Sequence, residues 1–220
     1  MLLRDNWEKL GVNLKEEILA FSGALTFPIK AEMWEELISR HTMDPMGITN
    51  IWEAGSHKQG SDIDLPNEDY SFSVKSAKVG GVYKQKMSIS SFRTTKHETL
   101  KEKLDFIDGS GKNFSHYFVL AREEDKKKSL RNYEALIIPG DLFAANDLTW
   151  ESTKSGWASK EKFGGELGYE MKIQKKMSDQ LWIYCDYKKL KDDPRVKVLF
   201  SVSIPYDELG KTHKLIRRAA

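Results

Sequence analysis

The chain has 220 residues, of which 40% are hydrophobic, 31% charged and 11% aromatic. This composition is typical of a folded globular protein, and the length suits one substantial core. No stretch approaches the ~20 apolar residues that a membrane-spanning helix requires, so we expect no membrane partner. The single cysteine, Cys185, excludes an internal disulfide and a cysteine-based zinc site. The N-terminus reaches polar residues at Arg4 and lacks the apolar run of a secretory signal, so we expect a cytoplasmic protein.

The charge is nearly balanced, with 35 basic and 33 acidic residues, but it is unevenly distributed. Lysines and arginines cluster at residues 126–128, 172–176, 188–191 and 214–218. Such clusters can bind phosphate groups even when the whole protein is near neutral. A solvated lysine face is the simpler interpretation of the same pattern.

In chain order, the sequence first predicts helices over residues 13–21 and 31–41, where apolar residues recur at helical spacing. An extended segment follows over residues 48–54. Two alternating runs, 61–65 and 71–75, then flank residues whose types favour a turn. This pattern predicts a β-hairpin.

A further helix is expected over residues 90–107. Apolar or alternating runs after it predict strands at residues 117–121, 135–139, 170–173, 181–184 and 196–205. Helices and strands in this order indicate an α/β (α+β) fold, with a mixed β-sheet flanked by helices and a β-rich C-terminal part. No repeat or linker interrupts the chain, so we expect a single domain over residues 1–220.

The predicted hairpin separates polar from apolar side chains. If Leu65 pairs with Tyr70, side chains alternate between the two faces, and directly opposed pairs project to the same face. One face then carries Asp62, Asp64, Ser71, Ser73 and Lys75, and the other carries Ile63, Leu65, Phe72 and Val74. An Asp-x-Asp before a turn often serves only the turn. A wholly apolar face opposite two carboxylates and an ammonium indicates more than a solvated hairpin.

The preceding segment adds another carboxylate. If residues 55–60 form a second hairpin loop, Glu53 falls opposite Asp62 on the polar face. Carboxylates gathered in this way repel one another unless a cation lies between them, and oxygen ligands suit Mg²⁺. A lysine beside such a cluster can position or deprotonate a water molecule. The hairpin is therefore a candidate magnesium site.

Two segments, Gly60-Ser61-Asp62-Ile63 and Phe72-Ser73-Val74-Lys75-Ser76, resemble the two halves of the PD-(D/E)xK nuclease motif, as found in type II restriction endonucleases. The resemblance implies that Asp62 and Lys75 are catalytic, together with the Ser73 position and Glu53. It also implies a metal site formed by Asp62, Glu53 and Val74. Ser61 replaces the motif's proline, and Ser73 replaces its second acid.

Four glutamates are candidates to supply the acid missing at Ser73. Glu53 is favoured because the hairpin geometry places it opposite Asp62. Glu36 comes second, because the family often places a glutamate on a helix before the core. Glu98 and Glu102, on the helix predicted after the motif, complete the set.

The resemblance covers about residues 31–140 as an α-β-β-β-α-β catalytic core, and residues 141–220 match nothing, although they could serve DNA recognition. It implies a restriction-endonuclease-like fold, a Mg²⁺ cofactor, and a homodimer that cleaves double-stranded DNA at a short specific site. A repair or recombination nuclease of the same superfamily is one alternative. A DNA-binding module that is catalytically inactive because of Ser73 is the other.

Two further segments are candidate DNA contacts. Ser91, Arg93 and Lys96 begin the helix expected after the motif, which in related enzymes often lies near DNA. Helix capping with solvated charge explains them equally well. Lys172 and Gln174 could place a hairpin in a groove, where Lys and Gln contact base edges, although an ordinary amphipathic hairpin is as plausible. The five histidines lack the spacing of a metal site.

Overall fold

The structure is a computed structural model that describes residues 2–53, 61–80, 85–109, 114–160 and 168–211. Its helices are α1 (Trp7–Ala24), α2 (Ala31–Glu36), which continues as the π-helix η2 (Leu37–Met43), α3 (Leu100–Asp108) and α4 (Tyr187–Asp192). Its strands are β1 (Ile63–Leu65), β2 (Tyr70–Gly80), β3 (Lys86–Arg93), β4 (His116–Asp125), β5 (Leu130–Pro139), β6 (Trp150–Thr153), β7 (Gly156–Ser159), β8 (Tyr169–Gln174), β9 (Gln180–Asp186) and β10 (Lys197–Pro205). Short 3-10 turns lie at Leu3–Asp5, Gly140–Leu142 and Lys175–Met177.

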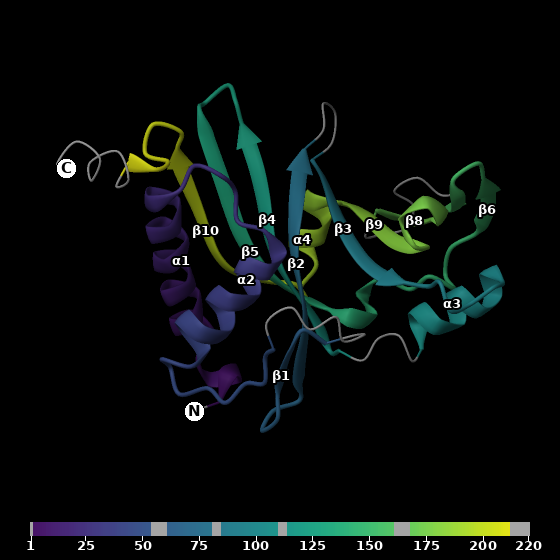
Figure 1. Cartoon of the computed structure of the whole chain (residues 1–220), viewed down its shortest axis with the longest axis horizontal. Helices are drawn as coiled ribbons and strands as arrows, with labels where there is room; N and C mark the ends of the chain where they lie inside the picture. The colour runs from purple at the N-terminus through teal and green to yellow at the C-terminus, as the bar shows by residue number, and fades with distance from the viewer. Residues whose placement is uncertain (1, 54–60, 81–84, 110–113, 161–167, 212–220) are drawn as a thin grey trace.

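Within the described ranges, ten strands form one sheet in the order β10-β5-β4-β2-β3-β9-β8-β7-β6, and β1 pairs with β2 beside this path. β2 and β4 run parallel, with Ser73 opposite Tyr117 and Lys75 opposite Val119. The neighbouring pairs β2–β3 and β4–β5 are antiparallel. The fold is therefore mixed α+β, a large mixed sheet flanked by a few helices (Figure 1).

Each side of the sheet has its own core. Phe72 and Val74 of β2 point to the side covered by α1 and α2, where Trp34 meets Phe118 at 5.3 Å between ring centroids. Alternate residues of the same strands point to the other side, where α3 and α4 pack. That second core includes Ala77, Val79, Tyr117, Val119, Leu104, Ile107 and Leu190. Burying each large apolar side chain contributes about 1.5–3 kcal/mol.

α1 lies very close to the edge strand β10. Its buried residues Leu10, Leu14 and Ile18 recur every four positions and form one apolar stripe. Between them, a Cβ atom on Gly11 would lie 2.6 Å from the carbonyl oxygen of Leu199. A glycine is therefore required for the helix to approach the strand this closely.

Most of the predicted elements are confirmed. α1 and the continuous helix α2–η2 cover the two helices expected near the N-terminus. The hairpin has the expected register, with Leu65 opposite Tyr70 and Asp64 opposite Ser71. The five later strands are present as β4, β5, β8, β9 and β10, each with somewhat different ends.

The helix expected over residues 90–107 is wrong in its first half. β3 extends to Arg93 and pairs with β9, and its residues Met87 and Ile89 are buried at strand spacing. α3 begins only at Leu100, and a capping box formed by Thr99 and Glu102 stabilises its first turn. Three of the candidate DNA contacts were therefore wrongly expected at the start of a helix. Ser91 and Arg93 lie on β3, and Lys96 lies in the turn before α3.

Among the described residues, none of the helices has both the length and the apolar character needed to cross a membrane.

Candidate active site

The edge of β2 that faces away from β4 changes partner along its length. Its first residues pair with β1, the last of them Phe72 with Ile63. Its last residues pair with β3, beginning with Lys78 and Ser88. Between them, residues 73–77 meet no other strand of the described part of the chain on this edge. We call this interval the β2 gap. Its backbone N–H and C=O groups must find other partners.

Asp62 and Lys75 supply those partners to Val74. A single oxygen of the Asp62 carboxylate accepts the Val74 backbone N–H at 2.7 Å and the Lys75 ammonium at 3.0 Å. The ammonium also donates to the Val74 carbonyl oxygen at 2.9 Å. The Ser73 hydroxyl, on a buried residue, donates to the same Asp62 oxygen at 3.4 Å. Asp62, Ser73 and Lys75 are thus held in one hydrogen-bonded cluster.

The Asp62–Lys75 ion pair is largely removed from solvent. Each of the two side chains is 19% exposed. Because partly buried charges lose hydration, such a pair is stabilising only when further hydrogen bonds satisfy it, as the Val74 backbone does here. The arrangement fixes a carboxylate oxygen and an ammonium nitrogen at defined positions beside the β2 gap.

Glu35, in the last turn of α2, interacts electrostatically with both Asp62 and Lys75. The indole N–H of Trp52 donates to the Glu35 carboxylate at 3.4 Å, and Arg40 lies over the Trp52 ring at 5.0 Å. Burial raises the pKa of Glu35, and repulsion from the Asp62 carboxylate raises it further. The Trp52 hydrogen bond and the Lys75 ammonium oppose that rise without cancelling it.

Glu35 was not among the four predicted glutamates, although the sequence contained a signal for it. Successive residues of a helix are about 100° apart around its axis. Trp34, Leu37 and Ile38 define the buried side of the helix. Glu35 borders that side, whereas Glu36 is about 200° from Trp34 and points away from the sheet.

The structure assigns other contacts to two of the predicted glutamates and leaves a third exposed. Glu36 is within 3.7 Å of Arg40, and both side chains are exposed. Glu102 accepts the backbone N–H groups of Glu98 and Thr99 at 3.0 Å each, which commits its carboxylate to the cap of α3. Glu98 itself is exposed, as is Lys96 in the turn before it.

The bridge before β1 has the register from which hairpin geometry placed Glu53. Ile51 and Asp64 form an antiparallel bridge, in which the N–H of each donates to the carbonyl oxygen of the other at 2.8 and 3.1 Å. Continued by two residues, this register sets Glu53 opposite Asp62, as the sequence predicts. Glu53 is exposed. The predicted loop over residues 55–60 lies outside the described residues.

The β2 gap offers oxygen donors that suit magnesium. In the described ranges, no group of three or more His, Cys, Asp or Glu side chains is arranged to hold a metal ion. Mg²⁺ commonly needs fewer, since one or two carboxylates suffice when waters and substrate phosphates complete its shell. Asp62, Glu35 and the Val74 carbonyl oxygen are the groups here that could contribute ligands to such a shell.

The candidate DNA contacts separate into two groups. Ser91 is half-buried, and its hydroxyl shares a hydrogen bond of 2.9 Å with that of Tyr117 in the core, so it is engaged inside the protein. Arg93 is exposed at the end of β3, opposite Gln180. Lys172 and Gln174 are half-exposed on β8 and alternate with the buried residues Met171 and Ile173.

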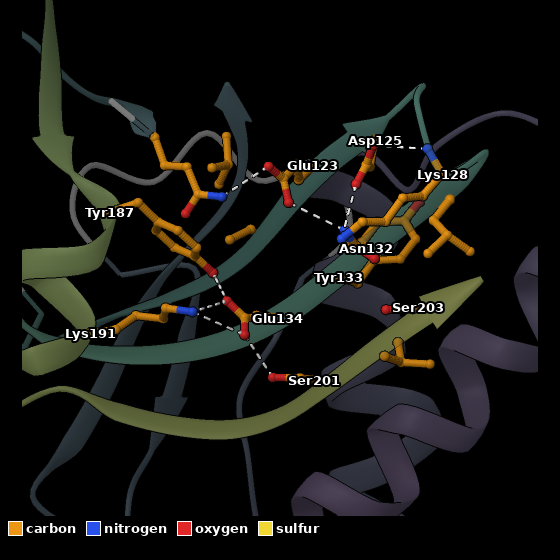
Figure 2. Close-up of a pocket in the computed structure, with 15 residues that line it drawn as sticks. Glu123, Asp125, Lys128, Asn132, Tyr133, Glu134, Tyr187, Lys191, Ser201 and Ser203 are labelled. Atoms are coloured by element: carbon orange, nitrogen blue, oxygen red, sulfur yellow. Dashed lines mark hydrogen bonds and ion pairs between the residues drawn. The ribbon is translucent and has the colours of Figure 1, made fainter. Parts of the chain in front are cut away.

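A second polar cluster lies in a pocket on the side of the sheet covered by α4 (Figure 2). The Glu134 carboxylate accepts hydrogen bonds from the Tyr187 hydroxyl, from Lys191 at 2.9 Å and from Ser201 at 2.8 Å. Burial alone would raise the pKa of Glu134, but these hydrogen bonds lower it below its ordinary value. The cluster satisfies itself and ties α4 to β5 and β10, which is a structural role.

Comparisons of the chain with family models, with curated proteins and with solved structures find no match in any of the three. The β2 gap is a candidate site by its own geometry: Asp62 and Lys75 are fixed against Val74, and Glu35 interacts electrostatically with both.

Proposed function

We propose that this chain is a Mg²⁺-dependent endonuclease that hydrolyses phosphodiester bonds of double-stranded DNA, in the manner of a type II restriction enzyme. The observation that carries the proposal is the attachment of Asp62 and Lys75 to the two backbone groups of Val74 at the β2 gap. A carboxylate, a carbonyl oxygen and an ammonium then converge where a phosphate can approach a strand edge.

The order of elements supports a restriction-endonuclease-like fold. The helix α2, the bridged segment at Ile51, the β1–β2 hairpin, α3 and β4 follow one another as the resemblance implies. β4 lies parallel to β2 and directly beside the residues of the motif. One departure is β3, a strand of eight residues between the hairpin and α3.

The roles of the residues follow from their positions. Asp62, Glu35 and the Val74 carbonyl would hold the magnesium ion, which when bound would supply positive charge against the scissile phosphate. The Lys75 ammonium would orient the attacking water and offset the negative charge that develops on the phosphate. Ser73 would keep Asp62 in place through its hydroxyl.

Glu35 is our choice for the acid that the motif lacks. The Ser73 side chain carries no charge and already donates to Asp62, so it cannot replace a second carboxylate. Glu35 approaches from α2 on the same side of the sheet as Phe72 and Val74, and its electrostatic interaction reaches both Asp62 and Lys75. Glu53 remains a second candidate, from the segment that follows the bridge at Ile51.

Incubation of the purified chain with supercoiled plasmid and Mg²⁺ tests the proposal. Discrete linear fragments that disappear in excess chelator are the expected result. Nicking confined to branched or damaged DNA would instead assign a repair or recombination nuclease. Retention of DNA without cleavage, in either Mg²⁺ or Mn²⁺, would contradict an enzymatic role. Light scattering of the same sample tests the homodimer that the resemblance implies.

A further inference from the structure

The ladder between β2 and β3 ends early. Its last pair on the side of the β2 gap is Lys78 opposite Ser88. In Figure 1 the two strands diverge beyond this pair, β2 toward the hairpin with β1 and β3 toward α3. Continued in the same register, the described ladder would next set Ser76 opposite Ser90, a pair that it lacks. The β2 gap is thus the stretch over which β3 lies off its neighbour.

A longer ladder would compete with the candidate active site. The Phe72 carbonyl oxygen accepts the Asp62 N–H on the edge of β2 that faces away from β4. The backbone groups of Val74 and Ser76 face this edge as well, because alternate residues of a strand point their N–H and C=O to the same edge. After Ser76, the next step of the ladder would pair Val74 with β3. That step would occupy both backbone groups that hold Asp62 and Lys75.

A local irregularity and one hydrogen bond accompany the departure of β3. Its pairing with β9 shifts by one residue between Ser90 and Arg93, as at a β-bulge. A bulge leaves a residue unpaired and bends the strand that carries it. Ser91 lies in this interval, and its hydroxyl shares a hydrogen bond of 2.9 Å with the hydroxyl of Tyr117. The bend of β3 is therefore tied to a residue outside that strand.

Tyr117 is a rigid attachment point on the side of the sheet to which the Lys75 side chain points. It stands on β4 opposite Ser73, and side chains two apart on a strand share a side. Tyr117 is 1% exposed, and its ring packs against those of Phe114 and Phe143, at 4.7 and 6.3 Å between centroids. Because β2 lies between β4 and β3, the hydroxyl reaches β3 across the strand that carries the gap.

We propose that Tyr117 is a positioning residue which, through Ser91, keeps β3 off the β2 gap. The Val74 backbone then stays available to Asp62 and Lys75. Without the hydroxyl of either Tyr117 or Ser91, the ladder closes by at least one further pair. The effect on cleavage rests on the proposed function, whereas the effect on the two strands does not.

Amide hydrogen exchange tests the effect on the strands. In Tyr117→Phe and in Ser91→Ala, the protection factors of the Ser76 and Ser90 N–H groups should rise about 3–10-fold, as expected when each gains one net hydrogen bond. A role in packing alone predicts the opposite sign. A lost buried hydrogen bond would then loosen its surroundings and lower the protection of nearby backbone groups.

Tyr133→Phe is the matched control. Tyr133 is also 1% exposed, and its hydroxyl accepts the Ile29 N–H at 3.3 Å on the other side of the sheet. The control therefore removes a buried, hydrogen-bonded hydroxyl that has no part in the β2 gap. Its melting temperature should fall to an extent similar to that of Tyr117→Phe, and the protection of Ser76 and Ser90 should stay unchanged.

Cleavage assays test the effect on the proposed reaction. Single-turnover rates in Mg²⁺ should fall about 10–100-fold in Tyr117→Phe and Ser91→Ala. The reason is that Asp62 and Lys75 lose the backbone groups that fix them. DNA affinity in chelator should stay within about twofold of the wild-type value, because the displaced groups act in the chemical step. Tyr133→Phe should change neither quantity.

Three results would overturn the positioning role. One is unchanged or lower protection of Ser76 and Ser90 in both Tyr117→Phe and Ser91→Ala. The second is higher protection in these variants with an unchanged cleavage rate, and the third is an equal loss of cleavage in Tyr133→Phe. Failure of the proposed function gives a different result, in which protection rises as expected but the wild-type chain does not cut DNA in Mg²⁺.

Discussion

Replacing Asp62 by asparagine removes one charge from the β2 gap and leaves the shape of the side chain unchanged. At the 3.0 Å separation of the Asp62–Lys75 pair, Coulomb attraction is about 5–6 kcal/mol for an effective dielectric constant near 20. Most of that attraction is offset because both groups regain hydration when the pair is lost. The amide oxygen of asparagine can still accept the Val74 N–H and the Lys75 ammonium.

We therefore expect Asp62→Asn to lower the free energy of unfolding by only about 1–2 kcal/mol. For a chain of this size the melting temperature should fall by about 2–8 °C. Cleavage should fall much further, by about a hundredfold to ten-thousandfold, as for other losses of a main catalytic group. DNA affinity without metal should be unchanged or tighter, because a negative charge near the phosphate is gone.

Plasmid cleavage rates in Mg²⁺, thermal melting and anisotropy in chelator measure these three quantities. Asp64→Asn is the matched control, because Asp64 is an exposed residue one pleat nearer the hairpin turn. Its cleavage rate should be within about threefold of the wild-type rate, a much smaller change than the loss of a catalytic group causes. An Asp62→Asn variant that melts as expected and cleaves as fast as this control would show that the β2 gap is not the active site.

Three further predictions concern Glu35 and the metal. Glu35→Gln should reduce cleavage at least about a hundredfold and abolish the rise in melting temperature on adding Mg²⁺, whereas Glu36→Gln should do neither. Mg²⁺ or Mn²⁺ should support cleavage and Ca²⁺ only binding, and full activity in excess chelator would contradict the metal site. Burial and the Asp62 carboxylate raise the pKa of Glu35 above its ordinary value of 4.5. The protonated Glu35 side chain therefore contributes stability that is fully present at a pH below 4.5. That contribution is lost as the pH rises through the raised pKa of Glu35. In metal-free melting curves, Glu35→Gln should not show this loss of stability with rising pH. Identical pH profiles of the melting temperature for variant and wild type would refute the prediction.

The hairpin could be predicted in detail because its information is local. Alternation of Ile63, Leu65, Phe72 and Val74 leaves one register that buries all four, and the structure has that register. The segment before α3 could not be assigned in the same way. Its serines and threonines resemble helix caps, and the strand that buries Met87 and Ile89 lies far along the chain.

For the candidate site, too, local contacts could be predicted from the sequence and contacts between distant segments could not. Placing Asp62 near Lys75 required only strand geometry. The hydrogen bonds of both groups to Val74 also require that β1 and β3 do not pair with residues 73–77 of β2. Glu35 was within reach of a helical-wheel argument, because it borders the side of Trp34 and Glu36 does not. Its approach to Asp62 still required the position of α2 on the sheet.

The pairing of β3 with β9 has a consequence for how the chain is made. It joins Met87 to Cys185, 98 positions later. At synthesis rates of about 5–20 residues per second, β3 emerges from the ribosome about 5–20 s before its partner. For that interval its edge is a template for wrong pairing, and charged residues such as Lys86 and Arg93 oppose this. Because such distant pairings close late, we expect folding to be slow.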